Sequence, residues 1–259
     1  MSLMTLSGRG GTRRLVGSIY FPGSVDNDDG RVKILADTSS KTANIGSTDI
    51  TVEMWLRPDA TGNNEAAITA GANNNWIWGN IFFDRDRNTQ PRSWGMSLGD
   101  GRVAVGVMNG SSSARTIVGS TDIRDAAWHH IAFTRNVTDG TMSLYVDGTR
   151  EATATGPTGT ISYPDGGDPI EGYDFSDPYL VLGAEKHDLA EDYKGFLSEV
   201  RLSTSILYSG ASLTVPTAPL TGGVGLYHFN ESGSTVTDYS GNSNGTIQTG
   251  AIRSGMSPF

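Results

Sequence analysis

The sequence predicts an all-β protein, an antiparallel sandwich or barrel built from about a dozen short strands. The first observation is hydrophobic alternation with a period of two, which recurs in separate segments along the chain. The second is a glycine content of 34 in 259 residues, nearly double the average usage of about 7%. The third is that no stretch of ten residues carries a convincing helical period. Short strands joined by many turns account for all three observations.

The strand signal is clearest at residues 50–57, where Ile50, Val52, Met54 and Leu56 alternate with residues of the opposite face. Dipeptides of the Asp-Gly type follow or separate several of the apolar runs and indicate hairpins. The other strands are expected at residues 18–21, 31–35, 66–70, 76–83, 103–107, 128–135, 142–146, 179–182, 196–203, 226–229 and 245–247.

One domain over residues 17–259 is the simplest organisation, because no linker and no long internal repeat interrupts the pattern. A C-terminal hairpin at about 224–250 is expected to close or extend it. Residues 1–16 resemble a vector-derived leader followed by a flexible start. The only helical turn is expected at 205–210. The stretch 156–178 has no strand signal, and a loop of this length in a compact domain is usually functional or disordered.

The charge balance excludes several classes of partner. With 19 Lys and Arg against 28 Asp and Glu, the net charge is −9, which repels nucleic acid and anionic membranes.

The absence of cysteine excludes disulfides, thiolate zinc sites and a cysteine nucleophile. No apolar run approaches the roughly 18 residues of a membrane span, and the N-terminus lacks the apolar core of a signal peptide.

Four segments carry a resemblance to a known family. Residues 128–135 (WHHIAFTR) and 143–148 (SLYVDG) resemble the central hairpin of laminin-G-like and pentraxin-like domains, which are of the concanavalin A-like lectin/glucanase type. Residues 51–58 (TVEMWLRP) resemble an earlier strand of these domains, and 195–202 (GFLSEVRL) a late one. The matches occur in the family's order over about residues 19–202. They imply a two-sheet antiparallel jelly-roll sandwich.

The C-terminal part adds a less specific resemblance. Segments 206–208 (ILY), 215–221 (VPTAPLT), 226–229 (LYHF) and 237–242 (TDYSGN) are similar to the ends of laminin-G-like domains in marine phage structural proteins and bacterial secreted proteins. This resemblance implies an extracellular or virion-associated location. It also implies that the partners are a polysaccharide or other glycan, or other virion or surface proteins.

The resemblance also implies a calcium site. Residues 182–188 (LGAEKHD) resemble the calcium loop of pentraxins, so Glu185, Asp188 and Asp192 are expected to bind calcium as a cofactor. Calcium takes six to eight oxygen ligands from carboxylates, amides and carbonyls. The alternative is that these residues form a solvated loop on an acidic protein.

Sugar rings stack their C–H faces on aromatic side chains, while their hydroxyls bind amides and carboxylates. Residues 73–80 (NNNWIWGN) combine amides with two tryptophans. On a strand Trp76 and Trp78 share one face, so both are exposed or both belong to the core. The long loop supplies further aromatic and acidic residues. The candidate ligand contacts are Asn74, Trp76, Tyr173, Asp174 and Phe175.

The evidence on catalysis is mostly negative. No strand has the E-x-D-x-E pattern of a retaining jelly-roll glycosidase. Asp84 and Asp86 share a face, but alternating arginines indicate a charge-balanced edge. Residues 95–99 match G-x-S-x-G without the helix that a nucleophile elbow needs. We therefore predict that the protein is no enzyme but a glycan-binding, lectin-like module, with calcium dependence left open. The alternative is a structural or adhesion domain of a virion or cell surface, and a polysaccharide hydrolase or lyase ranks third.

Overall fold

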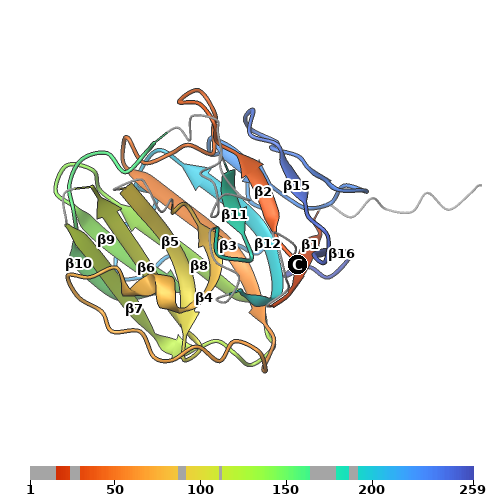
Figure 1. Cartoon of the computed structure of the whole chain (residues 1–259), viewed down its shortest axis with the longest axis horizontal. Coiled ribbons are helices and arrows are strands. Elements are labelled where there is room, and N and C mark those ends of the chain that lie inside the picture. The colour runs from red at the N-terminus through yellow and green to blue at the C-terminus, as the bar shows by residue number, and fades with distance from the viewer. Residues whose placement is uncertain (1–15, 24–29, 87–91, 111–112, 164–178, 187–191) are drawn as a thin grey trace, which may run out of the picture.

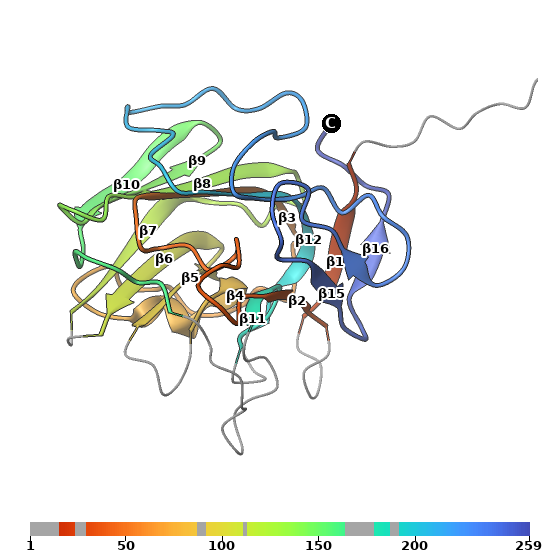
Figure 2. The same ribbon diagram turned by 90° about the horizontal axis from the view of Figure 1, so that it is seen from above.

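The structure is a computed structural model that describes residues 16–23, 30–86, 92–110, 113–163, 179–186 and 192–259. In this part of the chain, sixteen β-strands form two antiparallel sheets packed face to face (Figures 1 and 2). The described residues contain no α-helix and one short 3₁₀ helix, η1 (Asn75–Trp78). The predicted fold class, an all-β two-sheet antiparallel jelly-roll sandwich, is confirmed.

Sheet A consists of β1 (Ser18–Pro22), β3 (Ile50–Pro58), β8 (His129–Arg135), β9 (Thr141–Val146), β10 (Thr149–Thr155), β12 (Lys194–Ser203), β13 (Gly225–Tyr227) and β16 (Ile252–Ser254). Its strand order is β10-β9-β8-β3-β12-β1-β16, and β13 pairs with one end of β12. The order shows that strands far apart in sequence lie side by side.

Sheet B consists of β2 (Val32–Leu35), β4 (Asn80–Asp84), β5 (Arg92–Gly99), β6 (Arg102–Asn109), β7 (Ala114–Asp122), β11 (Tyr179–Leu182), β14 (Thr235–Val236) and β15 (Gly245–Ile247). Its strand order is β14-β15-β2-β11-β4-β5-β6-β7. The C-terminal strands therefore contribute to both sheets, since β13 and β16 belong to sheet A and β14 and β15 to sheet B.

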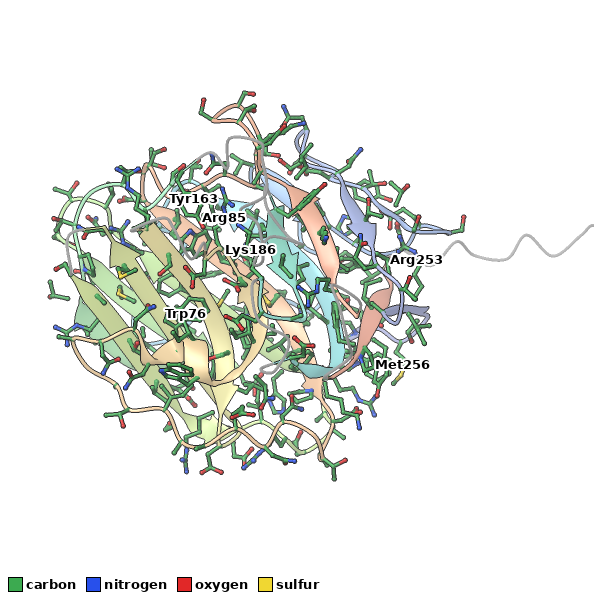
Figure 3. All side chains as sticks on the ribbon, in the orientation of Figure 1. Trp76, Arg85, Tyr163, Lys186, Arg253 and Met256 are labelled. Carbon is green, nitrogen blue, oxygen red and sulfur yellow. The ribbon has the colours of Figure 1, made fainter. Side chains whose placement is uncertain are left out.

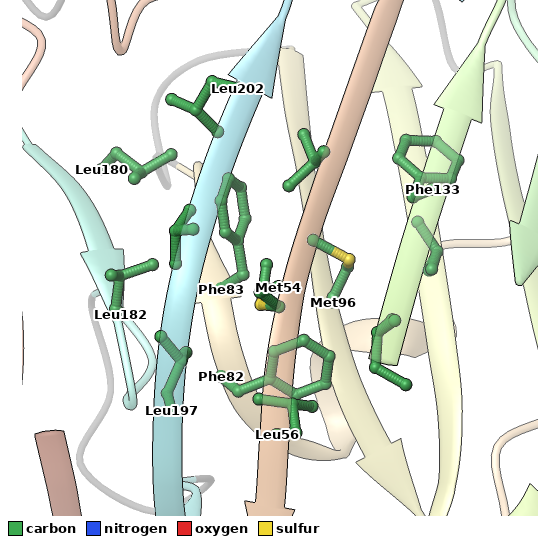
Figure 4. Close-up of a cluster of buried hydrophobic side chains, with 14 of the residues drawn as sticks. Met54, Leu56, Phe82, Phe83, Met96, Phe133, Leu180, Leu182, Leu197 and Leu202 are labelled. Carbon is green, nitrogen blue, oxygen red and sulfur yellow. The ribbon is translucent and has the colours of Figure 1, made fainter. Parts of the chain in front are cut away.

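The core lies between the two sheets and follows from the alternation in the sequence. In β3, Val52, Met54 and Leu56 are fully buried and pack in one cluster with Phe83 and Met96 of sheet B (Figure 4). Burying one such side chain contributes about 1.5–3 kcal/mol. The residues between them in the sequence face outward, so each sheet has an outer face that other segments can cover.

Three local predictions are wrong. Residues 66–70 form no strand, and residues 205–210 form no helical turn. The strand expected at 76–83 is divided into η1 and β4. The sequence predicts no strand at β7 or β10, because both carry many Thr, Ala and charged residues and show no clear apolar alternation.

No helix in the described residues is long and apolar enough to cross a lipid bilayer.

Two extended segments cover the outer faces of the sandwich. Residues 60–79, which include η1, lie over sheet B, and residues 204–222 lie over sheet A on the opposite side (Figure 2). Residue contacts agree with this view. Ile68 packs against Gly99 of β5, and the Tyr145 hydroxyl of β9 donates a hydrogen bond of 2.9 Å to the carbonyl of Gly210.

Candidate functional site

Trp76 attaches η1 to the outer face of sheet B (Figure 3). Its indole is fully buried over Gly95 of β5 and Gly106 of β6. A Cβ atom on Gly106 would lie 1.7 Å from Trp76 Cδ1, so only glycine leaves room for the ring. Trp76 Nε1 donates a hydrogen bond of 2.7 Å to Asn74 Oδ1. Asn74 and Trp76 thus fix the turn, and the buried indole offers no surface to a ligand.

Trp78 is the exposed tryptophan of this segment. The expectation that Trp76 and Trp78 share one face is wrong, because a 3₁₀ helix has three residues per turn and places them on different sides. Trp78 is 62% exposed. It borders a hollow of about 310 Å³ lined by Ala66, Ala67, Ile68, Thr69, Asn75 and Trp78. An exposed indole beside hydroxyl and amide groups is a suitable platform for a sugar ring.

The expected calcium ligands are placed only in part. The Glu185 carbonyl accepts a hydrogen bond of 2.8 Å from the Arg31 guanidinium, and the Asp192 carbonyl accepts one of 3.1 Å from Asn80 Nδ2. Both residues therefore lie beside sheet B. Within the described ranges, no three His, Asp or Glu residues are grouped so as to hold a metal ion. The third expected calcium ligand, Asp188, lies outside those ranges. So do three of the expected glycan contacts, Tyr173, Asp174 and Phe175.

Arg85, which directly follows β4, stacks its guanidinium on the ring of Tyr163 (Figure 3). The Arg85 guanidinium lies 4.2 Å from the centroid of the Tyr163 ring, and the Tyr163 hydroxyl donates to the Arg85 carbonyl at 2.5 Å. The Lys186 ammonium lies 5.9 Å from the same ring. Tyr163 and Lys186, which are distant from each other in sequence, are thereby fixed beside the end of β4.

Two of the residues considered for catalysis have structural roles. Asp84 is fully buried and accepts hydrogen bonds from the backbone N–H groups of Asp86 at 2.6 Å and Lys186 at 2.7 Å. The hydroxyl of Ser97, in the G-x-S-x-G segment, is buried in β5 and donates to the Trp76 carbonyl at 2.5 Å. Neither side chain is presented to a substrate.

A buried ionic network joins sheet A to the segment that covers it. Glu53 is fully buried, and its carboxylate accepts hydrogen bonds from Arg201 Nε at 2.6 Å and the Tyr208 hydroxyl at 2.8 Å. His130 Nε2 lies 3.1 Å from the same carboxylate. Burial alone would raise the pKa of Glu53, but His130 and Arg201 outweigh it and lower the pKa. Burial and the Glu53 charge raise the pKa of Tyr208 to about 12, so the phenol stays a donor.

His129 of β8 lies between two carboxylates. Its Nδ1 is 2.7 Å from Asp147 Oδ2, and its Nε2 is 2.9 Å from Asp125 Oδ1. Because a carboxylate only accepts, both bonds can form together only when both ring nitrogens carry a proton, so the two carboxylates favour the positively charged imidazole. Burial alone would lower the pKa of His129, but the bonds to Asp147 and Asp125 outweigh it and raise the pKa above 6.5.

This arrangement predicts a pH dependence of stability. A raised pKa contributes stability that is fully present below the ordinary value of 6.5 and is lost as the pH rises through the folded-state value. We expect the difference in melting temperature between wild type and His129→Gln to be larger at about pH 5.5 than at about pH 9. Asp125→Asn, whose carboxylate is 58% exposed, is the control and should have a smaller effect. Equal His129→Gln differences at both pH values would contradict the prediction.

The comparisons with known proteins identify the family. The family model Laminin_G_3, described as the concanavalin A-like lectin/glucanases superfamily, matches residues 28–209. The chain belongs to this superfamily, which confirms the predicted laminin-G-like family. Among curated proteins no significant match is found.

Solved structures resemble the chain at low sequence identity. A structure described as a putative carbohydrate binding protein from Bacteroides ovatus is 16% identical with a TM-score of 0.54, and the match covers 94% of this chain and 60% of that one. The heptameric SAP-like pentraxin from Limulus polyphemus is 16% identical with a TM-score of 0.49, covering 76% and 80%. Domains LG4-5 of the mouse laminin alpha1 chain are 12% identical with a TM-score of 0.49, covering 83% and 48%. The likeness to the Bacteroides ovatus protein shows a shared fold.

Proposed function

We propose that the protein is a non-catalytic carbohydrate-binding module that contacts its glycan through Trp78. The observation that carries the proposal is an indole that is 62% exposed on a turn anchored by the fully buried Trp76. Because the turn is anchored, its backbone loses little conformational freedom on binding, and the indole offers its face to the C–H groups of a sugar. Thr69 and Asn75 line the adjacent hollow and supply groups for sugar hydroxyls.

Two further observations support this proposal. The Bacteroides ovatus structure that shares the fold is described as a putative carbohydrate binding protein. The buried carboxylates of Asp84 and Glu53 are occupied by backbone amides and by an ion pair, so neither is poised as a general acid or nucleophile. We also propose that the protein is extracellular, a location that fits a glycan ligand.

The direct test replaces the exposed indole. We expect Trp78→Ala to weaken binding to a responsive polysaccharide at least tenfold, about 1.4 kcal/mol, because the stacking surface is lost. A glycan array with neutral and uronic sugars selects the ligand, and isothermal titration measures the dissociation constant.

The control for this test is Tyr239→Ala, which removes another exposed aromatic ring, 46% exposed, near the C-terminus. This variant should bind like wild type. Silence of the wild-type protein across the array would contradict the proposal and favour a structural or adhesion role. Equal losses in the two variants would contradict the specific role of Trp78.

We further propose that binding depends on one calcium ion held by Glu185, Asp188 and Asp192. Glu185 and Asp192 lie at the two ends of the short segment that carries Asp188. Asp192 forms a β-bridge with Ile81, so this end of the segment is fixed to β4. A calcium ion bound by carboxylates from both ends would pin the segment to sheet B.

Calcium addition tests this second part of the proposal. A cation that binds only the folded state stabilises it by about 1.4 kcal/mol at ten times its dissociation constant. We therefore expect the melting temperature to rise with calcium at about 10 mM, if the site has the affinity typical of extracellular modules, and Asp188→Asn to remove the rise. Magnesium is the control, because it requires stricter octahedral geometry. No calcium effect on wild type would contradict the site while leaving the role of Trp78 open.

A further inference from the structure

A second cavity lies on the outer face of sheet A, on the opposite side of the sandwich from Trp78. Its volume is about 170 Å³, and its walls come from β8, β9, β10 and the covering segment 204–222. It is therefore much smaller than the roughly 300–1,000 Å³ of sites for drug-sized ligands, and suits a molecule no larger than one sugar unit. The lining residues are Thr134, Asn136, Asp139, Thr141, Ser143, Arg150, Ile206, Tyr208 and Ser209.

The floor of the cavity belongs to a row of hydroxyl side chains that crosses sheet A. The strand register places five such residues directly opposite one another on five adjacent strands, in the order Ser203, Thr51, Thr134, Ser143 and Thr153. Opposite residues on one face have Cβ atoms about 4.5–5.5 Å apart. The row therefore forms a regular ladder of groups that both donate and accept hydrogen bonds.

Two members of this row, Thr51 and Thr153, already form hydrogen bonds with the protein itself. The Thr51 hydroxyl donates to the Ser205 carbonyl at 2.7 Å, and the Thr153 hydroxyl donates to the Met142 carbonyl at 2.9 Å. The two members that line the cavity, Thr134 and Ser143, differ. Ser143 Oγ has a long contact of 3.4 Å with Thr153 Oγ1, and the Thr134 hydroxyl makes no hydrogen bond within the described part of the chain. Thr134 and Ser143 thus retain hydrogen-bonding capacity where the cavity lies.

The wall of the cavity formed by the covering segment is fixed in place and includes the apolar side chain of Ile206 and the ring of Tyr208. Ile206 and Tyr208 lie above the hydroxyl floor. The Tyr208 hydroxyl is held by Glu53 at 2.8 Å, and its ring centroid lies 6.1 Å from that of Tyr145. Arg150 Nη1 donates to the Ser209 carbonyl at 3.3 Å and ties this wall to β10. A ligand between the two walls would meet C–H contacts above and hydroxyl groups below.

We propose that this cavity binds one neutral polyol unit, such as a single pyranose. Thr134 and Ser143 exchange hydrogen bonds with its hydroxyls, and the Tyr208 ring covers its C–H face. The lining has one carboxylate, Asp139, and one guanidinium, Arg150, so its formal charge is zero and favours neither anions nor cations. The site is independent of Trp78 and lies on the other sheet, so the module would hold sugars on both faces.

The experiment is an NMR titration of backbone amides with glucose, galactose and mannose, and with glucuronate as the charged comparison. A ligand of this size binds weakly, so we expect a dissociation constant on the order of millimolar for at least one neutral sugar. Chemical shift changes should centre on Thr134, Ser143 and Tyr208. Thr134→Val, which keeps the side-chain shape, and Ser143→Ala should each weaken binding at least threefold. Thr134→Ser should restore it, and Trp78→Ala should leave it unchanged.

The outcomes separate this proposal from the one for Trp78. No shift change around the cavity at about 50 mM sugar, well above a millimolar dissociation constant, would overturn the inference. Equal affinity in Thr134→Val and wild type, with both folded by their amide spectra, would also overturn it. Shift changes that Trp78→Ala abolishes would assign the sugar to the Trp78 surface alone. Changes that survive Trp78→Ala and are lost in Ser143→Ala would support the second site even if no polysaccharide binds at Trp78.

Discussion

Glu53→Ala is expected to lower the free energy of unfolding by about 3–5 kcal/mol, because it breaks an ion pair whose carboxylate is fully buried and leaves the largely buried Arg201 without its counter-charge. The Glu53 carboxylate binds Arg201, Tyr208 and His130 at once. Its loss therefore also frees the segment that Tyr208 attaches to sheet A. Chemical denaturation at neutral pH measures the effect. The control is Arg102→Ala, in which the exposed pair with Asp100 is lost and at most about 1 kcal/mol should follow.

The acid dependence of Glu53 gives a second readout of the same network. Because the pKa of Glu53 is lowered, its contribution is present above the ordinary value of 4.5 and is lost as the pH falls through the folded-state value. The stability difference between wild type and Glu53→Gln should therefore shrink from about pH 7 to about pH 3. A difference that stays constant over this range would show that the carboxylate charge adds nothing.

The fold could be predicted where the apolar residues of a strand fall at every second position and enter the core. In β3, Val52, Met54 and Leu56 alternate without exception, so strand type and core face both follow from the sequence. In β10, the segment TREATAT is half-buried or exposed at the edge of sheet A, so its burial pattern is weak. The residues of η1 predict a strand because Trp and Ile favour strands, whereas the conformation of the turn depends on the packing of Trp76 against distant glycines.

The candidate sites depend more on register than on local pattern. Thr134 and Ser143 are opposite each other only because β8 and β9 pair as they do, and the sequence between them carries no sign of a cavity. Trp78 could be singled out as aromatic, but its exposure follows from the 3₁₀ geometry of one turn. Glu185 and Asp188 were identified by resemblance, and their role as ligands stays a prediction.

Trp76→Ala is expected to lower the free energy of unfolding by about 3–5 kcal/mol, the usual cost of removing a buried indole. The indole fills the space between η1 and sheet B, so its loss leaves a cavity over Gly95 and Gly106. Because Trp76 also fixes the turn that presents Trp78, glycan binding should weaken in the same variant. Denaturant unfolding measures the stability, and titration with the selected polysaccharide measures the binding.

A double-mutant cycle with Gly106→Ala tests the cause of this loss. With Trp76 present, the methyl group added by Gly106→Ala meets the Cδ1 atom of the indole. The substitution should therefore lower the free energy of unfolding by about 1–3 kcal/mol through overpacking. In the Trp76→Ala background the same methyl enters empty space, and its cost should be close to zero. The coupling between the two sites should therefore fall in the range of about 0.5–3 kcal/mol. Additive effects would mean that Trp76 does not rest on Gly106, and the anchoring of the Trp78 platform would need another explanation.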